Sequence, residues 1–289
     1  MEIIKTVREM RERLVPQKRQ GRTVGFVPTL GYLHEGHLTL LRRARVECDV
    51  VVASIYVNPI QFLAGEDFDA YPRDLERDGR LVATVPADYI FAPPDYEMYP
   101  RPQETFVDVP SLTGLLEGGV RPGHFRAIAT VVAKLFCIVQ PDRAYFGEKD
   151  YQQLLMVKRM VADLDMPIAV VGVPTVREAD GVACSSRNVF LSPAERRAAV
   201  RLNQALLEAR RLVAAGERDA AALREKLRAF ITAEPLATPE VVAVCCADDL
   251  RDVAGPLPPR FVVLLFVCFG ATQLLDHCVI ELPHGPGRG

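Results

Sequence analysis

Short apolar runs alternate with longer stretches of helical periodicity along the first part of the chain. Thr23 to Val27 and Asp49 to Val57 are short, apolar and rich in β-branched residues, which is typical of buried strands. Between them, apolar residues recur at the spacing of one helix face, at Leu38, Leu41 and Ala44. Strand, helix and strand in succession predict a β-α-β unit with parallel strands.

The same alternation continues to about residue 173. We expect a helix within residues 5–20 and three further strands, at Asp88 to Pro93, Pro141 to Phe146 and Ile168 to Val173. Gly123 opens a long apolar helix that continues to Val139, and another helix is expected up to about Asp165. Residues 93–123 are rich in Pro and Gly and predict an extended loop with one short helix.

The pattern changes near Val176, where we place a domain boundary. Residues 192–195 read Ser-Pro-Ala-Glu, a capping box that starts a helix expected to reach Ala215. The elements expected after it are a helix over Asp219 to Ala233, strands near Val241–Ala247, Phe261–Phe269 and Cys278–Leu282, and a disordered tail over residues 284–289. The predicted fold is therefore an α/β, Rossmann-like parallel-sheet domain over residues 1–175, followed by a smaller α+β domain over residues 176–289.

Composition narrows the class of protein. The 289 residues are 49% hydrophobic and 25% charged with a formal net charge of −2, which does not suggest a nucleic-acid-binding polycation. The longest apolar run, Phe261 to Phe269, is too short to span a bilayer, and Met1 to Lys5 lacks a signal-peptide pattern. Seven cysteines without a Cys-x-x-Cys pair favour a reduced, cytoplasmic protein. For the adjacent Cys245 and Cys246, two thiols in a buried strand are favoured over a metal site or a strained disulfide.

The most informative stretch runs from Val24 to His37. Pro28 and Gly31 end the apolar run, so a turn follows the strand, and a helix begins after it. A helix N-terminus offers unpaired backbone N–H groups and the positive end of its dipole, which suits phosphate. His34 and His37 share one face of this turn. A solvated turn and a zinc site are the alternatives, and no third histidine or cysteine lies near enough in sequence to favour zinc.

Other polar residues follow the expected strands. Asn58 and Gln61 come after the second strand and Lys149 after the fourth, at the strand ends where open α/β sheets bind ligands. Each also has a simpler interpretation as a turn residue or a solvated surface charge. A lone histidine is usually a hydrogen-bonded part of the scaffold, so His124 is given a structural role. A Walker P-loop and a GxGxxG motif are both missing from the sequence, which disfavours common kinases and dehydrogenases.

The segment Pro28 to His37 resembles the HxGH signature of the adenylate-forming nucleotidyltransferases. It is closer still to the PTMGALHxGH motif of the pantothenate synthetase (pantoate–β-alanine ligase) family, with Leu30 and Tyr32 in place of Met and Ala. Further segments resemble that family at residues 54–62 (SIFVNPxQF), 71–74 (YPRD), 123–136 (GHFRGVxTVVxKLF, with Ala127 for Gly), 147–153 (GxKDxQQ) and 184–188 (MSSRN, with Cys184 for Met). The resemblance weakens near the C-terminus, where Gln273 and His277 replace the arginine and asparagine of GxTRLIDN.

The resemblance implies a two-step ligase. Pantoate would attack the α-phosphorus of ATP to give pantoyl adenylate and pyrophosphate, and β-alanine would then displace AMP to give pantothenate. It also implies Mg²⁺ with ATP as co-substrate, a homodimer, and no nucleic-acid or membrane partner. By the same analogy the catalytic residues are His37, His34, Lys149 and Arg187; the ATP-binding residues are Leu30, Gly31, Tyr32, Leu33, His34, Glu35, Gly36, His37, Gly147, Glu148, Lys149, Asp150, Val176, Cys184, Ser185, Ser186 and Arg187; and the pantoate and β-alanine residues are Gln61, Gln153 and Asn58.

Two alternatives remain open at this stage. One is another nucleotidyltransferase of the same fold that adenylylates a phosphate ester, which would require more cations near the acceptor and no paired Gln61 and Gln153. The other is a non-catalytic nucleotide-binding descendant, which only the departures at Leu30, Cys184 and Gln273 would support.

Overall fold

A computed structural model describes residues 1–62 and 68–283, and its contacts divide the chain into two compact units. The first unit comprises residues 1–148 and 153–176, and the second comprises residues 149–152 together with the chain from Arg177 onward. The segment from Glu66 to Asp78, which contains the YPRD resemblance, begins outside the described residues, and the predicted tail over residues 284–289 lies outside them entirely.

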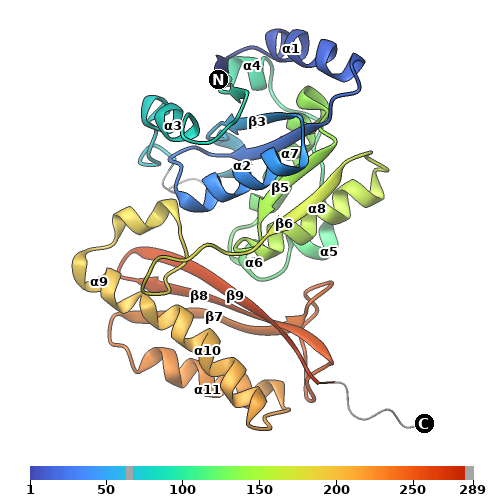
Figure 1. The fold of residues 1–289 in the computed structure, drawn as a ribbon. Helices are drawn as coiled ribbons and strands as arrows, with labels where there is room; N and C mark the ends of the chain where they lie inside the picture. Colours follow the sequence, from blue (N-terminus) through green and yellow to red (C-terminus); the bar gives the residue numbers. More distant parts are fainter. Residues whose placement is uncertain (63–67, 284–289) are drawn as a thin grey trace. The chain divides into compact units, whose positions relative to one another are not determined.

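The first unit is built on a parallel sheet (Figure 1). Its strands lie in the order β1 (Glu2–Ile4), β4 (Tyr89–Phe91), β3 (Val50–Ile55), β2 (Val24–Thr29), β5 (Arg143–Gly147) and β6 (Ala169–Val173). The five predicted strands are confirmed. The short edge strand β1 was not predicted, because three residues are too few to show a period.

Helices cover both faces of this sheet. Val27 packs in one core cluster with α2 (Glu35–Glu47) and α3 (Leu75–Val82), whereas the ring of Phe26 contacts that of Phe136 in α7 (His124–Val139). Because neighbouring strand residues point to opposite faces, α2 and α7 lie on opposite sides of β2. The helices α1 (Val7–Arg19) and α8 (Tyr151–Asp163) complete the α/β pattern that the sequence predicts.

The connection from β4 to α7 differs from the prediction of one short helix. It holds three single-turn helices, α4 (Asp95–Met98), α5 (Pro110–Thr113) and α6 (Glu117–Val120). Elements of four residues are shorter than the window over which a helical period becomes visible in a sequence.

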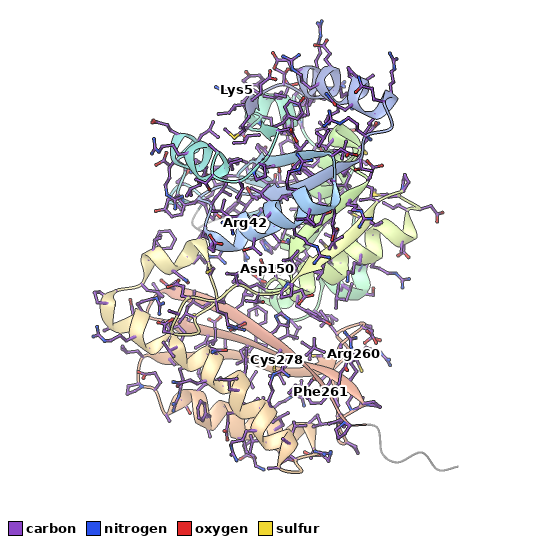
Figure 2. All side chains as sticks on the ribbon, viewed as in Figure 1. Lys5, Arg42, Asp150, Arg260, Phe261 and Cys278 are labelled. Carbon is purple, nitrogen blue, oxygen red and sulfur yellow. The ribbon has the colours of Figure 1, made fainter. Side chains whose placement is uncertain are left out.

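The second unit is a three-stranded antiparallel sheet in the order β7 (Ala237–Cys246), β8 (Arg260–Phe269) and β9 (Thr272–Glu281). Helices α10 (Val200–Ala214) and α11 (Ala220–Thr232) lie against this sheet (Figure 1). Phe261 of β8 and Cys278 of β9, both labelled in Figure 2, belong to the core cluster that the helices and the sheet share.

Two predicted boundaries in this unit were wrong. The single helix expected up to Ala215 is split at Ala199 into α9 (Pro193–Ala198) and α10, where the N–H of Leu202 bonds to the Ala199 carbonyl. The last strand begins at Thr272 rather than Cys278, because a tight turn at Gly270 pairs Phe269 with Thr272. The capping box at residues 192–195 is confirmed.

The described part of the chain contains no helix of the length and apolarity needed to cross a membrane. All seven cysteines are free thiols. Cys245 is buried as predicted, but Cys246 is only half-buried.

Candidate active site

Three neighbouring strands of the first unit deliver the predicted residues to one edge of its sheet. The strands β3, β2 and β5 are adjacent and parallel, so their carboxyl ends lie at the same edge. The chain after β2 carries His34 and His37, the chain after β3 carries Gln61, and the first turn of α8 after β5 carries Gln153. The strand order therefore brings the histidine pair and both glutamines to the edge where α/β sheets bind ligands.

The loop between β2 and α2 is held in a sharp turn. Gly31 has a φ of +90°, and a side chain there would meet Ile55 Cγ2 at 2.9 Å and Asp78 Oδ2 at 3.1 Å, so only glycine fits without a shift. The Gly31 N–H donates to the hydroxyl of Thr29 at 3.1 Å, and that hydroxyl donates to the Ser54 carbonyl at 2.6 Å. The backbone N–H of Gly31 is thus tied to β2 and, through Thr29, to β3.

A buried carboxylate that sequence reasoning missed holds the next two residues. Asp78 in α3 accepts the N–H groups of Tyr32 at 2.7 Å and Leu33 at 2.8 Å, and it pairs with Arg77 at 3.1 Å. Arg77 also donates to the Leu33 carbonyl, and its guanidinium lies 4.4 Å from the centre of the Tyr32 ring. Burial raises the pKa of Asp78, while the two N–H donors and Arg77 oppose that effect.

The run that ends at Asp78 resembles the family at residues 71–74 and could equally be a solvated loop and helix start; the helix start is confirmed at Leu75, but the run is not solvated at Asp78. Its end enters α3, and Asp78 is fully buried. Asp78 and Arg77 together make α3 a clamp on the loop from Leu30 to Leu33, which keeps the start of α2 in place.

The two histidines cap α2 in the manner of a capping box. Nδ1 of His34 accepts the Gly36 N–H at 3.2 Å, and Nδ1 of His37 accepts the His34 N–H at 3.3 Å. The two ring centres are 4.0 Å apart. A neutral imidazole whose Nδ1 accepts carries its hydrogen on Nε2, and an imidazole N–H is a donor of the kind that binds anions.

Gln61 is held from two directions. Its side-chain Oε1 accepts from Nδ2 of Asn58 at 3.2 Å, and its carbonyl accepts from Nδ1 of His124 at 2.8 Å. Nε2 of His124 lies 3.0 Å from Arg121, which pairs with Glu117 at 2.8 Å. His124 is thus hydrogen-bonded inside the fold, as predicted, and it fixes the backbone of the turn that carries Gln61.

The second unit contains the other predicted cations. Lys149 is only 19% exposed in its side chain and pairs with Asp150 at 3.3 Å (Asp150 is labelled in Figure 2). The next residue, Tyr151, donates its hydroxyl to the Ala247 carbonyl at 2.8 Å and lies with its ring centre 4.8 Å from that of His277. These contacts explain why residues 149–152 group with the second unit although they precede most of α8.

The segment from Arg177 to Asn188 is also ordered by its own side chains. Ser185 caps the short helix at Ser186–Phe190 by accepting the Arg187 N–H at 3.2 Å. Asn188 donates to Glu178 at 2.9 Å and to the Ala183 carbonyl at 3.1 Å. Cys184, Ser186 and Arg187 are half-buried within this turn. The predicted hydroxyls and the guanidinium of Arg187 therefore stand on one compact turn.

The remaining predicted residues lie around these two groups. Gly147 ends β5, and the Glu148 N–H donates to the Val173 carbonyl at 2.8 Å, so both stand at the same sheet edge as the histidines. Leu30, Glu35 and Val176 follow β2, start α2 and follow β6, respectively. The first unit thus brings together the histidine pair and the glutamines, and the second unit holds Lys149 and the turn with Ser185 to Arg187.

The polar groups of each unit, taken separately, suit an anion better than a bare metal ion. Among residues 1–62 and 68–283, no group of three or more His, Cys, Asp or Glu side chains is arranged to hold a metal. In the first unit Glu35 pairs with Arg42, and in the second Asp150 pairs with Lys149. Imidazole N–H groups, an ammonium and a guanidinium are ligands for phosphate oxygens.

One departure from the resembled family lies in the second unit. His277 is 8% exposed, and its Nδ1 has no hydrogen-bond partner among the described residues. Beside it, Asp276 forms a buried ion pair with Arg177. Burial lowers the pKa of His277 to about 4. The carboxylates of Asp276 and Asp150 oppose this shift, whereas Arg177 and Lys149 add smaller contributions that lower the pKa further.

Burial of His277 predicts that the second unit loses stability at acidic pH. Folded His277 stays neutral above about pH 4, whereas the unfolded chain takes up the proton below its ordinary pKa of 6.5. The unfolded state therefore binds more protons between these values, and stability falls as the pH is lowered through this window. From about pH 7.5 to about pH 4.5 we expect His277 to remove about 2 kcal/mol from the free energy of unfolding.

Urea unfolding followed by circular dichroism measures this effect, since the chain has no tryptophan for fluorescence. His277→Asn, the residue of the resembled family, is expected to lose that part of the pH dependence. His277→Phe, which keeps a ring against Tyr151, is expected to lose it as well. An unchanged pH dependence in both variants would mean that His277 is not the group responsible.

Comparisons with known proteins agree with the resemblance in the sequence. The family described as Pantoate-beta-alanine ligase matches residues 2–279. Pantothenate synthetases of Brucella canis and Brucella ovis are each 55% identical over 280 residues, covering 97% of this chain and 96% of theirs.

Solved structures give the same result. A pantothenate synthetase from Thermus thermophilus superposes with a TM-score of 0.90 at 48% identity, covering 96% of this chain and 99% of that one. A pantoate-beta-alanine ligase from Francisella tularensis, complexed with beta-gamma ATP and beta-alanine, has a TM-score of 0.78 at 29% identity and covers 96% and 97% of the two chains.

Proposed function

Because the chain belongs to the pantoate–β-alanine ligase family, we propose that it condenses (R)-pantoate with β-alanine to pantothenate at the expense of ATP. The structural observation that carries this proposal is the pair of imidazoles that caps the start of α2, on the same sheet edge as two uncharged glutamines. Such an edge suits a polyphosphate beside a small hydroxy acid.

The reaction would proceed in two displacements. A carboxylate oxygen of pantoate attacks the α-phosphorus of ATP, a P–O bond forms, and pyrophosphate leaves with the electrons of the broken P–O bond. The amine of β-alanine then attacks the acyl carbon, AMP leaves, and the amine loses a proton. Both steps depend mainly on positioning and on stabilising the charge that develops on phosphate oxygens.

The histidines, lysine and arginine would supply that stabilisation. His34 and His37 donate from Nε2 to phosphate oxygens, and the N-terminal end of α2 adds its backbone dipole. Lys149 and Arg187 contribute cations, and the hydroxyls of Ser185 and Ser186 contribute further hydrogen bonds. The remaining ATP contacts would come from the loop after β2, from Gly147 to Asp150, and from Val176 and Cys184.

Neutral amides suit the pantoate pocket. A lysine or arginine at the carboxylate would stabilise the nucleophile in its ground state, whereas an amide binds it without neutralising its charge. We therefore assign pantoate binding to Gln61 and Gln153, assisted by Asn58, with Gln61 also close to β-alanine. The burial of Asn58 and Gln61 supports this assignment, since buried amides hold a fixed orientation.

Mg²⁺ would arrive with ATP, held mostly by phosphate oxygens and water, and would supply charge neutralisation there. Residues 1–175 would bind ATP and pantoate, with residues 176–289 as a lid.

Free thiols are consistent with a location in the cytoplasm. Family resemblance alone suggests a homodimer, and analytical ultracentrifugation would test this oligomeric state.

Isotope exchange between pyrophosphate and ATP tests the proposed reaction. Because the first displacement is reversible and does not involve the amine, we expect exchange that requires pantoate but not β-alanine. AMP should accumulate in stoichiometric amounts with pantothenate when β-alanine is added. Exchange that runs equally well without pantoate would contradict the assignment and favour another nucleotidyltransferase.

A further inference from the structure

A relay of three polar side chains leads to the amide of Gln61. The hydroxyl of Tyr99, the residue that follows α4, lies 2.8 Å from Oδ1 of Asn58 and donates to it. Nδ2 of Asn58 in turn donates to Oε1 of Gln61 at 3.2 Å. Asn58 and Gln61 are 0% and 6% exposed, so water does not compete freely for these groups.

The donor direction of this relay is fixed at Tyr99. The phenol of Tyr99 donates to Oδ1 of Asn58 at 2.8 Å, and burial, with the nearby Asp95 carboxylate, raises the pKa of Tyr99 and so keeps this donor protonated. Asn58 must then accept through Oδ1, which turns its NH₂ group toward Gln61. Gln61 consequently accepts through Oε1, so its NH₂ is the donor end of the amide.

We propose that Tyr99 is a positioning residue that sets the amide of Gln61 as a donor toward an acceptor oxygen of pantoate. The inference rests on the proposed function, in which Gln61 binds pantoate. Pantoate offers acceptor oxygens on its carboxylate, and a reversed amide would turn a carbonyl oxygen toward that negative charge. Tyr99 would thus influence binding of the hydroxy acid without touching it.

The chain offers a matched control for this hydroxyl. Tyr56 lies beside Tyr99, with the ring centres 6.4 Å apart, and it is 5% exposed. Within the described residues its hydroxyl has no hydrogen-bond partner within 3.5 Å, and burial, followed by the Asp95 carboxylate, raises the pKa of Tyr56. Replacing either tyrosine by phenylalanine keeps the ring, and at Tyr99 it also keeps the contact with Lys134, whose ammonium lies 4.7 Å from the ring centre.

The experiment compares Tyr99→Phe, Tyr56→Phe, Gln61→Ala and the double variant Tyr99→Phe/Gln61→Ala in the full chain. Steady-state kinetics gives the KM for pantoate and for ATP, and thermal melting reports on the fold. We expect Tyr99→Phe to raise the KM for pantoate about tenfold, the effect of one buried hydrogen bond, with the KM for ATP within about twofold. Tyr56→Phe should leave both constants within about twofold, because its hydroxyl lies outside the relay.

The double variant distinguishes a relay from a general effect on packing. If Tyr99 acts through Gln61, adding Tyr99→Phe to Gln61→Ala changes the KM for pantoate by less than about twofold. An equal rise in both backgrounds, or an equal effect of the two tyrosine variants, would overturn the inference. A Gln61→Ala variant with an unaltered KM for pantoate would instead refute the proposed role of Gln61, and the inference with it.

Discussion

His37→Ala is expected to slow formation of pantoyl adenylate by about 100- to 1,000-fold, the loss that follows removal of one donor to a developing oxyanion. The reason is the geometry of the capping pair. Nδ1 of His37 accepts the His34 N–H, which leaves the Nε2–H as the donor that the ring presents. A single-turnover assay with saturating ATP and pantoate measures this rate.

The second step provides an internal control. With pre-formed pantoyl adenylate and β-alanine, the His37→Ala variant should react within about threefold of the unaltered protein, since that step needs no transfer at phosphorus. If the variant is as slow from the intermediate as from ATP, then His37 does not act mainly on the phosphates.

The fold of His37 variants needs its own control, because the ring also caps α2. Loss of a cap costs about 1 kcal/mol, so His37→Ala should lower the melting temperature slightly. Glutamine is a residue that capping boxes use at this helical position, so His37→Gln should restore the melting temperature. Adenylate formation should remain slow in both variants. A rate that recovers in proportion to melting temperature would assign His37 to the scaffold alone.

The sequence predicts the strands best where they are buried on both faces. Val24, Phe26 and Val27 of β2 have no exposed surface, so the whole run is apolar and can be recognised as a strand from its own residues. The turn at Gly31 can be predicted for a similar reason, because its positive φ is a property of that residue alone and favours glycine. Resemblance to a known family, rather than physical pattern, supplied most of the individual site residues.

Contacts between distant residues account for what the sequence did not predict. Asp78 looks like any acidic residue of an exposed helix, yet it accepts the N–H of Leu33, 45 positions earlier. Tyr99 reaches Asn58 across 41 positions. No local period or propensity encodes such pairs, because each depends on how β-α-β connections bring loops together.

The last strand shows the same limit. The polar residues among Thr272 to His277 do not match the apolar pattern of a buried strand, so the predicted last strand starts only at Cys278. In the structure, Asp276 is buried because Arg177, 99 positions earlier, pairs with it. A charged residue can therefore continue a strand when a partner from another segment compensates for its burial.

Lys149→Ala and Arg187→Ala are each expected to slow adenylate formation by about 30- to 1,000-fold, which corresponds to about 2–4 kcal/mol of lost transition-state stabilisation. Removal of Lys149 leaves Asp150 with 47% of its side chain in solvent, so the carboxylate is not stranded in the interior. At Arg187 the cap on the short helix uses the backbone N–H, which alanine retains.

The decisive comparison uses cations of the same type outside the site. Lys158 and Arg197 are exposed on helices, so Lys158→Ala and Arg197→Ala should leave the single-turnover rate unchanged within about twofold. If Lys149→Ala or Arg187→Ala slowed the rate by less than about threefold with ATP saturating, that residue would no longer belong to the phosphate site. Equal losses in the site variants and their matched controls would instead point to a general effect of net charge, and not to contacts with ATP.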